Sequence, residues 1–254
     1  MQRPKSKAKQ PAQETGPIPR RGFLLGAGTA VAAGLAPATA AQAQAPTSTS
    51  SALAVSGPGS ASAPQGFLTL TATEAAFLSA AADTFIPADE LSPSGSDCGV
   101  VVFIDRQLAG AWGSGAKMYR SGPFRRGKPE QGYQLPLTPR EFFAAGIVAA
   151  NAWTRKAYGK DFDRLLPEQR EAVLKELEAG KATLEDFNGK QFFEALLQIT
   201  MEGFFADPIY GGNRDKAGWR VVGYPGLPAV YSTLIDEYRN KRFVAEPQSI
   251  ADFS

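Results

Sequence analysis

Histidine is missing from this 254-residue sequence, and cysteine occurs once, at Cys98. Without histidine there can be no Ser-His-Asp triad, no histidine-ligated metal and no Cys-x-x-Cys-His attachment of haem. A single cysteine excludes an internal disulfide, and it excludes a Cys₄ zinc or iron–sulfur site within the chain. Because these shortages remove most enzyme classes, we expect no catalytic residue, no cofactor-binding residue and no metal ligand in this chain.

Charged residues are absent from positions 22–73, and positive charge is concentrated before that stretch. Residues 1–45 hold six lysines and arginines against one acid, which leaves 21 against 24 in residues 46–254, a net charge of −3. A nucleic-acid-binding domain needs a basic face that neutralises phosphates. We therefore expect no nucleic-acid partner.

The first 45 residues have the order of an export signal. A basic segment is followed by an Arg-Arg pair, a weakly apolar run over residues 22–36 and several Ala-x-Ala tripeptides over residues 38–45. This order is typical of a signal peptide, and the arginine pair before Phe-Leu-Leu resembles a twin-arginine (Tat) signal. The alternative is an uncleaved membrane anchor, but the run has about 15 apolar residues and roughly 20 are needed to span a bilayer. We predict export by the Tat translocon to the periplasm, on a motif made of Arg20, Arg21, Phe23 and Leu24.

A Ser/Ala/Pro/Gly-rich stretch over residues 46–66 predicts a flexible linker, and residues 67–254 then form one domain. No segment of that domain alternates convincingly between apolar and polar residues, so we expect no sheet. The fold class is all-α: a single irregular helical domain with long Gly/Pro-rich loops.

Cap residues and apolar periodicity place six helices in the domain. Thr71 and Glu74 form a capping box, and so do Thr138 and Glu141. Ser96 or Asp97 is expected to cap a further helix. The predicted helices start at residue 71 and stop before 87, cover 100–109, run from 139 to 158, from 167 to 180 and from 191 to 205, and end with 228–240.

An irregular Gly-rich stretch over residues 110–137 separates two of these helices. It contains four aromatic residues, so we expect parts of the stretch to pack against the core or a partner. Its small basic cluster, Arg125, Arg126 and Lys128, is interpreted as a solvated loop.

Glycine and aromatic residues are concentrated between Glu202 and Gly226, where a predicted helix runs into a Gly-rich turn. Glycine, asparagine and aspartate tolerate the backbone conformations of tight turns. The aromatic residues belong either to the core or to a surface that binds a partner. The candidate interface residues are Phe204, Phe205, Asp207, Tyr210, Gly211, Gly212, Asn213, Asp215, Trp219 and Tyr224.

This block resembles the small (gamma) subunit of gluconate 2-dehydrogenase, the subunit-3 family. Two weaker features agree with the resemblance: the twin-arginine leader, and the turn at residues 85–89 followed by the Gly-Val-Val-Val-Phe-Ile-Asp run at 99–105. The likeness extends over roughly residues 70–242. It departs from the family pattern at Ser96-Asp97-Cys98-Gly99, where smaller residues such as Gly-Ala are expected.

The resemblance implies a subunit without a cofactor of its own. In that family the small subunit accompanies a large FAD-containing dehydrogenase of the glucose-methanol-choline oxidoreductase type, and it supports that subunit's assembly and Tat export. A multihaem cytochrome c subunit passes the electrons on to quinone in the membrane. Related complexes oxidise sugars and glycosides, including at C3, so the substrate does not follow from this chain.

Two other classes of function stay open at this point. Glu202, Asp207 and Asp215 are candidates for paired carboxylates in a stand-alone hydrolase or lyase, although acids beside glycine and proline are more often turn formers. A small-molecule binding module is the other class. The Gly-Gly-Asn-Arg run at 211–214 fits no phosphate-loop pattern, and Asp89, Asp97 and Asp105 lack the spacing of a calcium loop.

Overall fold

Helices form the part of the chain that the computed structural model describes, which is residues 66–254 except 126, 129–130, 186, 228–229 and 254. These residues contain α- and 3₁₀-helices and two isolated β-bridges but no strand, which confirms the all-α prediction. The predicted signal peptide, with Arg20, Arg21, Phe23 and Leu24, lies outside the described residues, as does the predicted linker apart from Gly66. Within the described part, no helix has the length and apolar character needed to span a membrane.

Two helices begin at the predicted capping boxes. Helix α2 (Ala72–Phe85) starts after Thr71, whose hydroxyl accepts the N–H of Glu74 while the Glu74 carboxylate accepts the N–H of Thr71. Helix α4 (Pro139–Tyr158) repeats this arrangement with Thr138 and Glu141, and it ends at Gly159 in the left-handed conformation. Each box satisfies N–H groups that a helix start leaves without an intrahelical partner, so these boundaries follow from local sequence alone.

Helix α3 (Val100–Ala109) has the predicted range, but its predicted cap is wrong. The N-cap is Gly99 at φ 79°, and neither Ser96 nor Asp97 caps the helix. Ser96 instead donates through its N–H and hydroxyl to Asp83 on α2. A Cβ at position 99 would lie 2.5 Å from the carbonyl oxygen of Gly211, so the position requires glycine because another segment of backbone passes beside it.

Three further α-helices follow along the chain: α5 (Pro167–Glu178), α6 (Gly189–Phe205) and α7 (Ala217–Val222). The first two confirm predicted helices, whereas α7 was not predicted. The helix predicted over residues 228–240 is wrong: in its described part the chain forms a 3₁₀ turn, η6 (Ser232–Leu234), and further turns. Val230 and Ile235 are 68% and 58% exposed there, so these two β-branched residues would gain little burial in an α-helix to offset their low helix propensity.

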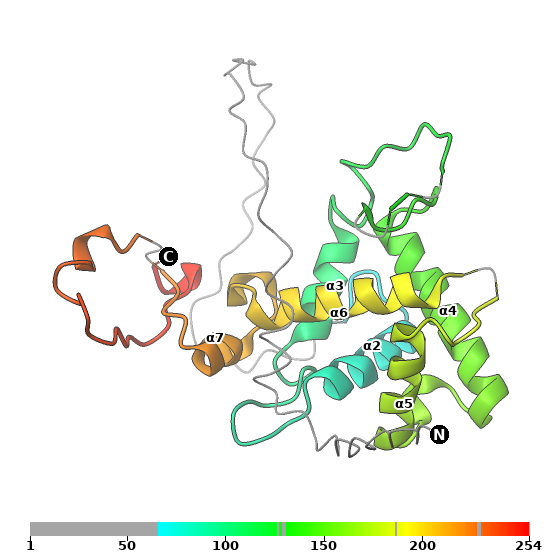
Figure 1. The fold of residues 1–254 in the computed structure, drawn as a ribbon, viewed down its shortest axis with the longest axis horizontal. Coiled ribbons are helices and arrows are strands. Elements are labelled where there is room, and N and C mark those ends of the chain that lie inside the picture. The colour runs from blue at the N-terminus through cyan, green and yellow to red at the C-terminus, as the bar shows by residue number, and fades with distance from the viewer. Residues whose placement is uncertain (1–65, 126, 129–130, 186, 228–229, 254) are drawn as a thin grey trace, which may run out of the picture. The chain divides into compact units, whose positions relative to one another are not determined.

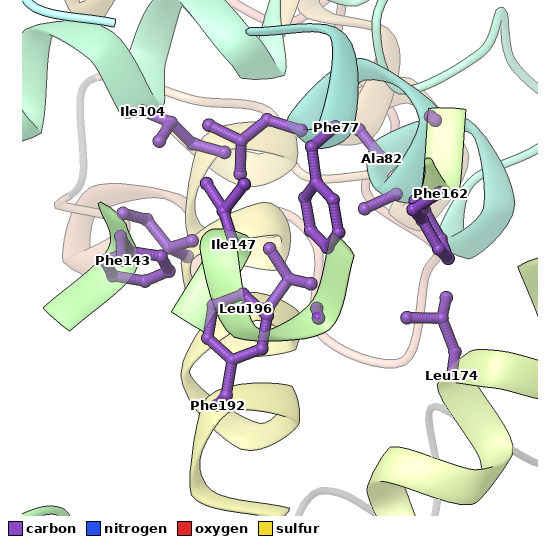
Figure 2. Close-up of a cluster of buried hydrophobic side chains, with 14 of the residues drawn as sticks. Phe77, Ala82, Ile104, Phe143, Ile147, Phe162, Leu174, Phe192 and Leu196 are labelled. Atoms are coloured by element: carbon purple, nitrogen blue, oxygen red, sulfur yellow. The ribbon is translucent and has the colours of Figure 1, made fainter. Parts of the chain in front are cut away.

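Helix α6 lies at the centre of the hydrophobic core and packs against α3, α4 and α5 (Figure 1). Its Phe192 is fully buried among aromatic rings that include Phe142, Phe143 and Phe77. Gly146 on α4 makes room for that ring, because a Cβ there would lie 2.2 Å from Phe192. Figure 2 shows Phe192 and Leu196 of α6 beside Ile147 of α4 and Phe77 of α2. The core is therefore built from side chains that five helices contribute.

A buried carboxylate, which the sequence analysis did not recognise, fixes the start of the domain. Asp105 on α3 is 3% exposed and accepts the backbone N–H groups of Leu68, Thr69 and Leu70 at 2.6, 2.9 and 3.0 Å. Three N–H donors to one carboxylate compensate for the cost of burying it. Asp105 therefore binds the chain segment that enters α2.

The stretch over residues 110–137 is irregular, as predicted. Its ends pack on α4: Tyr133 stacks on Phe142 with ring centroids 4.0 Å apart, and Trp112 lies near Phe143 at 6.3 Å. Burial raises the pKa of Tyr133 to about 12, with a further contribution from the charge of Glu141. Between these ends the chain leaves the helical core as a loop (green in Figure 1).

Candidate partner-binding site

The Gly- and aromatic-rich block folds back onto the end of α6. After α6 the chain makes two 3₁₀ turns, η4 (Pro208–Tyr210) and η5 (Arg214–Lys216), and then enters α7. Two glycines allow the backbone to pass directly beside the helix. A Cβ at Gly212 would lie 2.1 Å from the carbonyl oxygen of Gly203, and one at Gly218 would lie 2.2 Å from that of Phe204. The glycines thus serve close approach of main chain to main chain.

Asn213 joins the two sides of this turn. Its side chain is fully buried, its Nδ2 donates to the carbonyl of Ala206 at 2.8 Å, and its Oδ1 accepts the N–H of Gly218 at 2.8 Å. Trp219 adds a third link, because its indole N–H donates to the carbonyl of Phe205 at 2.8 Å. These bonds satisfy carbonyls that the end of α6 would otherwise leave without partners.

Arginine side chains connect the block to α3 and its preceding turn. The Arg214 N–H donates to the carbonyl of Cys98, and its guanidinium donates to the carbonyl of Asp97, both at 2.9 Å. Arg106 on α3 reaches the carbonyl of Ile209 at 3.4 Å.

Cys98 itself is buried, and burial together with the charge of Asp97 raises the pKa of its thiol. The thiol is therefore protonated and packs as a small apolar group.

The end of the described chain returns to the same block. One Asp207 oxygen accepts the N–H of Ile209 at 3.0 Å and the other accepts the N–H of Ile250 at 2.9 Å. Lys216 forms an ion pair with Asp252. The hydrogen bond from Lys216, followed by that from the Ser249 N–H, holds the pKa of Asp252 below its ordinary value of 3.8. Residues 249–252 are thus attached to the block by side-chain contacts.

Backbone strain is concentrated in this block. Of the four non-glycine residues with positive φ in the described part of the chain, three lie here: Asn213 at 47°, Asp215 at 55° and Lys216 at 58°. Such conformations cost roughly 1–3 kcal/mol each and persist only where the surroundings enforce them. The hydrogen bonds of Asn213 and Arg214 provide that enforcement.

Burial separates the ten candidate interface residues into three groups: buried, half-buried and exposed. Phe204, Trp219 and Asn213 are 5%, 6% and 0% exposed and, like Gly212, belong to the interior. Phe205, Asp207 and Gly211 are half-buried, whereas Asp215 is exposed. Tyr210 and Tyr224 are 51% and 40% exposed. Sequence reasoning missed two apolar residues beside them, Ile209 and Val222, which are 46% and 50% exposed. We call Ile209, Tyr210, Val222 and Tyr224 the exposed apolar set.

The candidate carboxylates of a stand-alone enzyme are not brought together as a reactive pair. Asp207 accepts two backbone N–H groups, Glu202 accepts the side-chain amide of Gln198 at 2.8 Å, and Asp215 is exposed in the strained turn. The three acids considered as cation ligands, Asp89, Asp97 and Asp105, do not converge on one site either. Each of their carboxylates accepts hydrogen bonds from a different segment of the chain. In the described residues, no group of three acids or cysteines is arranged to hold a metal ion.

Comparison with known families identifies the protein family to which a chain with these features belongs. The family model described as gluconate 2-dehydrogenase subunit 3 matches residues 72–226, which is more than half of the chain. The chain belongs to the gluconate 2-dehydrogenase subunit 3 family. The family name denotes a subunit of a multisubunit gluconate dehydrogenase complex.

The match with the subunit 3 family begins at the first residue of α2 and ends at Gly226, so it includes all ten candidate interface residues. It is shorter than the likeness over residues 70–242 expected from the sequence, and residues 227–254 follow it. No curated protein and no solved structure matches the chain.

Proposed function

We propose that this chain is the non-catalytic small subunit of a periplasmic, membrane-associated dehydrogenase complex. The complex oxidises a sugar or sugar acid, in the manner of gluconate 2-dehydrogenase or a glucoside 3-dehydrogenase. The small subunit supports Tat export, assembly and stability of the large subunit. One observation carries the proposal: the family match with a dehydrogenase subunit spans both the helical core and the whole Gly- and aromatic-rich block at residues 202–226, which we call the strained block.

The block supplies the surface for the large subunit. Its buried residues, above all Asn213 and Trp219, hold the turn in place. The exposed apolar set then presents two tyrosines and two aliphatic side chains, and interfaces are enriched in such aromatic residues. A turn that is already rigid loses little conformational entropy when the partner binds.

The redox groups are assigned to the partners. The large subunit, of the glucose-methanol-choline oxidoreductase type, holds FAD, and a multihaem cytochrome c subunit accepts the electrons. The residue inventory of this chain supports that division, because it has no histidine and its one cysteine is a buried, protonated thiol. The twin arginines at positions 20 and 21 supply the export signal for both subunits.

The test is a pull-down of the tagged full chain from its native host. We expect a large partner that carries flavin absorbance and oxidises gluconate, glucose or a simple glucoside with a dye as electron acceptor. Replacing Arg20 and Arg21 by lysine should remove the active complex from the periplasm. A colourless, inactive chain recovered alone would contradict the proposal.

The role of the exposed apolar set is tested separately with a double variant, Tyr210→Ser and Tyr224→Ser. Two truncated interface aromatics should lower recovery of the flavoprotein at least tenfold, since such anchors contribute about 2 kcal/mol or more each. The matched control is Val148→Ser with Leu166→Ser, which removes two apolar residues that are 65% and 61% exposed on other elements. Full complex yield with lost turnover in the tyrosine variant would assign the tyrosines to chemistry instead of assembly.

A binding module is the second candidate function, and one observation favours it. An open pocket of about 310 Å³ lies near the end of the described chain, and its mostly apolar lining includes Leu227, Tyr231 and Phe243. Small-molecule sites begin at about this size. Tight binding of a small molecule by the isolated full chain, lost on Phe243→Ala and without any flavoprotein partner, would favour this candidate.

A further inference from the structure

The loop between α3 and α4 differs in charge from the rest of the domain. Residues 110–137 hold five lysines and arginines and one acid, a net charge of +4. Because residues 46–254 together carry −3, the remainder of that region carries −7. This separation of charge leaves one positive loop on an otherwise acidic domain.

The loop is attached to the core at its ends only. Arg140 on α4 donates its N–H to the carbonyl of Gly113, and Gln191 on α6 reaches the carbonyl of Gly132. The hydrogen bonds of residues 119–131, as far as these are described, stay within the loop: Tyr119 with Gly122, Lys128 with Gln131, and Gln134 with Gln131. The tip is therefore free to bind a surface without disturbing the helices.

The side chains of the tip combine charge with aromatic area. Lys117, Arg120, Arg125 and Lys128 are exposed, and none of them forms an ion pair within the described residues. Tyr119 and Phe124 are 73% and 38% exposed, and Trp112 at the base is 48% exposed. We call Lys117, Tyr119, Phe124, Arg125 and Lys128 the basic–aromatic tip.

This tip lies at the opposite end of α6 from the exposed apolar set. Gly132 contacts Gln191 near the start of α6, whereas Asn213 and Trp219 contact residues 205–206 at its end. A 17-residue helix is about 25 Å long, well beyond the screening length of about 8–10 Å in physiological salt. One chain can thus bind a protein at one end and an anionic surface at the other.

We infer that the basic–aromatic tip binds the surface of a membrane that contains anionic phospholipids. Clustered lysines and arginines are attracted to anionic headgroups, and tyrosine rings favour the level of the headgroups. The net negative remainder of the domain is repelled by the same membrane, so the tip faces the lipid. This inference concerns the chain itself and does not depend on the proposed dehydrogenase partner.

The experiment measures binding of the full chain to vesicles of phosphatidylglycerol and phosphatidylcholine by co-sedimentation. The test variant is Lys117→Gln with Arg125→Gln and Lys128→Gln; Arg120 is left unchanged because its charge also acts on Glu141 at the start of α4. Loss of three basic residues, each contributing about 1 kcal/mol near an anionic surface, should weaken binding on the order of a hundredfold. Raising the salt concentration should weaken vesicle binding by the parent protein more than vesicle binding by the variant, because the variant has three fewer basic residues.

The matched control removes three exposed basic residues elsewhere that form no ion pair in the part of the chain that the structure describes: Lys160→Gln, Lys181→Gln and Arg242→Gln. The parent protein, the tip variant and the control all keep the same basic N-terminal residues, so differences in vesicle binding between them arise from the domain. The control should bind nearly as well as the parent, and vesicles of phosphatidylcholine alone should bind none of the proteins.

Equal binding by the tip variant and the control would overturn the inference. So would an unchanged vesicle affinity combined with loss of the flavoprotein from pull-downs of the tip variant, because the tip would then be a protein interface. A second variant, Tyr119→Ser with Phe124→Ser, keeps the charge and should weaken binding by a factor that salt does not change. If a pull-down finds no flavoprotein partner but vesicle binding behaves as described, the proposed function fails and this inference stands.

Discussion

The helical core and the interior of the strained block are both buried, but they are stabilised in different ways. The core relies on apolar area: Phe77, Phe142, Phe162 and Phe192 are all less than 2% exposed and pack ring against ring. The block relies on the close passage of backbones and on side-chain hydrogen bonds to main-chain carbonyls. A core of the first kind tolerates changes that keep volume and apolar character, whereas a block of the second kind fails when one polar atom is removed.

The largest expected effect belongs to the core. Phe192→Ala should lower the free energy of unfolding by about 3–5 kcal/mol, because it removes buried ring contacts and leaves a cavity where five helices meet. Urea denaturation followed by circular dichroism measures the change. Val148→Ala, at a position that is 65% exposed on α4, should change stability by less than about 0.5 kcal/mol. A small effect at position 192 would mean that the aromatic cluster contributes little.

The second-largest expected effect concerns the buried hydrogen bonds of the block. Asn213→Ala should destabilise the domain by about 2–4 kcal/mol, because the Ala206 carbonyl and the Gly218 N–H lose their buried partner. Asn240 is a natural control: it also has positive φ, at 59°, but is exposed. Asn240→Ala should cost about 1 kcal/mol or less, since only the backbone preference changes. Equal losses at both positions would show that backbone conformation alone, and not the buried hydrogen bonds, holds the block.

The smallest effect concerns the exposed contact between the block and the last described residues. Because the pKa of Asp252 is lower in the folded chain than its ordinary value of 3.8, the ion pair with Lys216 contributes fully above that value. The contribution is lost as the pH falls through the lower pKa of the folded state. In an NMR titration, Lys216→Gln should raise the pKa of Asp252 toward 3.8, whereas Lys160→Gln should leave it unchanged. An unchanged pKa in Lys216→Gln would show that the Ser249 N–H alone sets it.

Local signals in the sequence predicted most of the helices. The boxes at Thr71 and Thr138 and the glycine at 159 act within one helical turn, so neighbouring residues are sufficient to reveal them. The predicted helix over 228–240 failed because two of its β-branched residues, Val230 and Ile235, stay exposed and bury too little area to offset their low helix propensity. The prediction of the α3 cap failed because a distant contact decides the cap residue. Position 99 requires glycine since the carbonyl of Gly211, more than one hundred residues away, passes beside it.

The candidate site was located by sequence but not resolved into its parts. Glycine and aromatic content marked residues 202–226, yet only tertiary packing decides that Trp219 is interior and Tyr210 is not. Asp105 was considered only as a cation ligand. A lone acid between Val101 and Leu108, on the apolar face of α3, was the signal that it accepts hydrogen bonds inside the domain.

Asp105 also determines how the domain responds to force. Residues 68–70 are bound to α3 by three hydrogen bonds to one carboxylate, so a pull applied through the preceding chain loads those bonds together before it reaches α2. Bonds loaded in parallel share the force, whereas a helix pulled from its end would yield one turn after another. Any force that reaches the domain through the chain before residue 68 is therefore borne first by these three bonds, and only afterwards by the turns of α2.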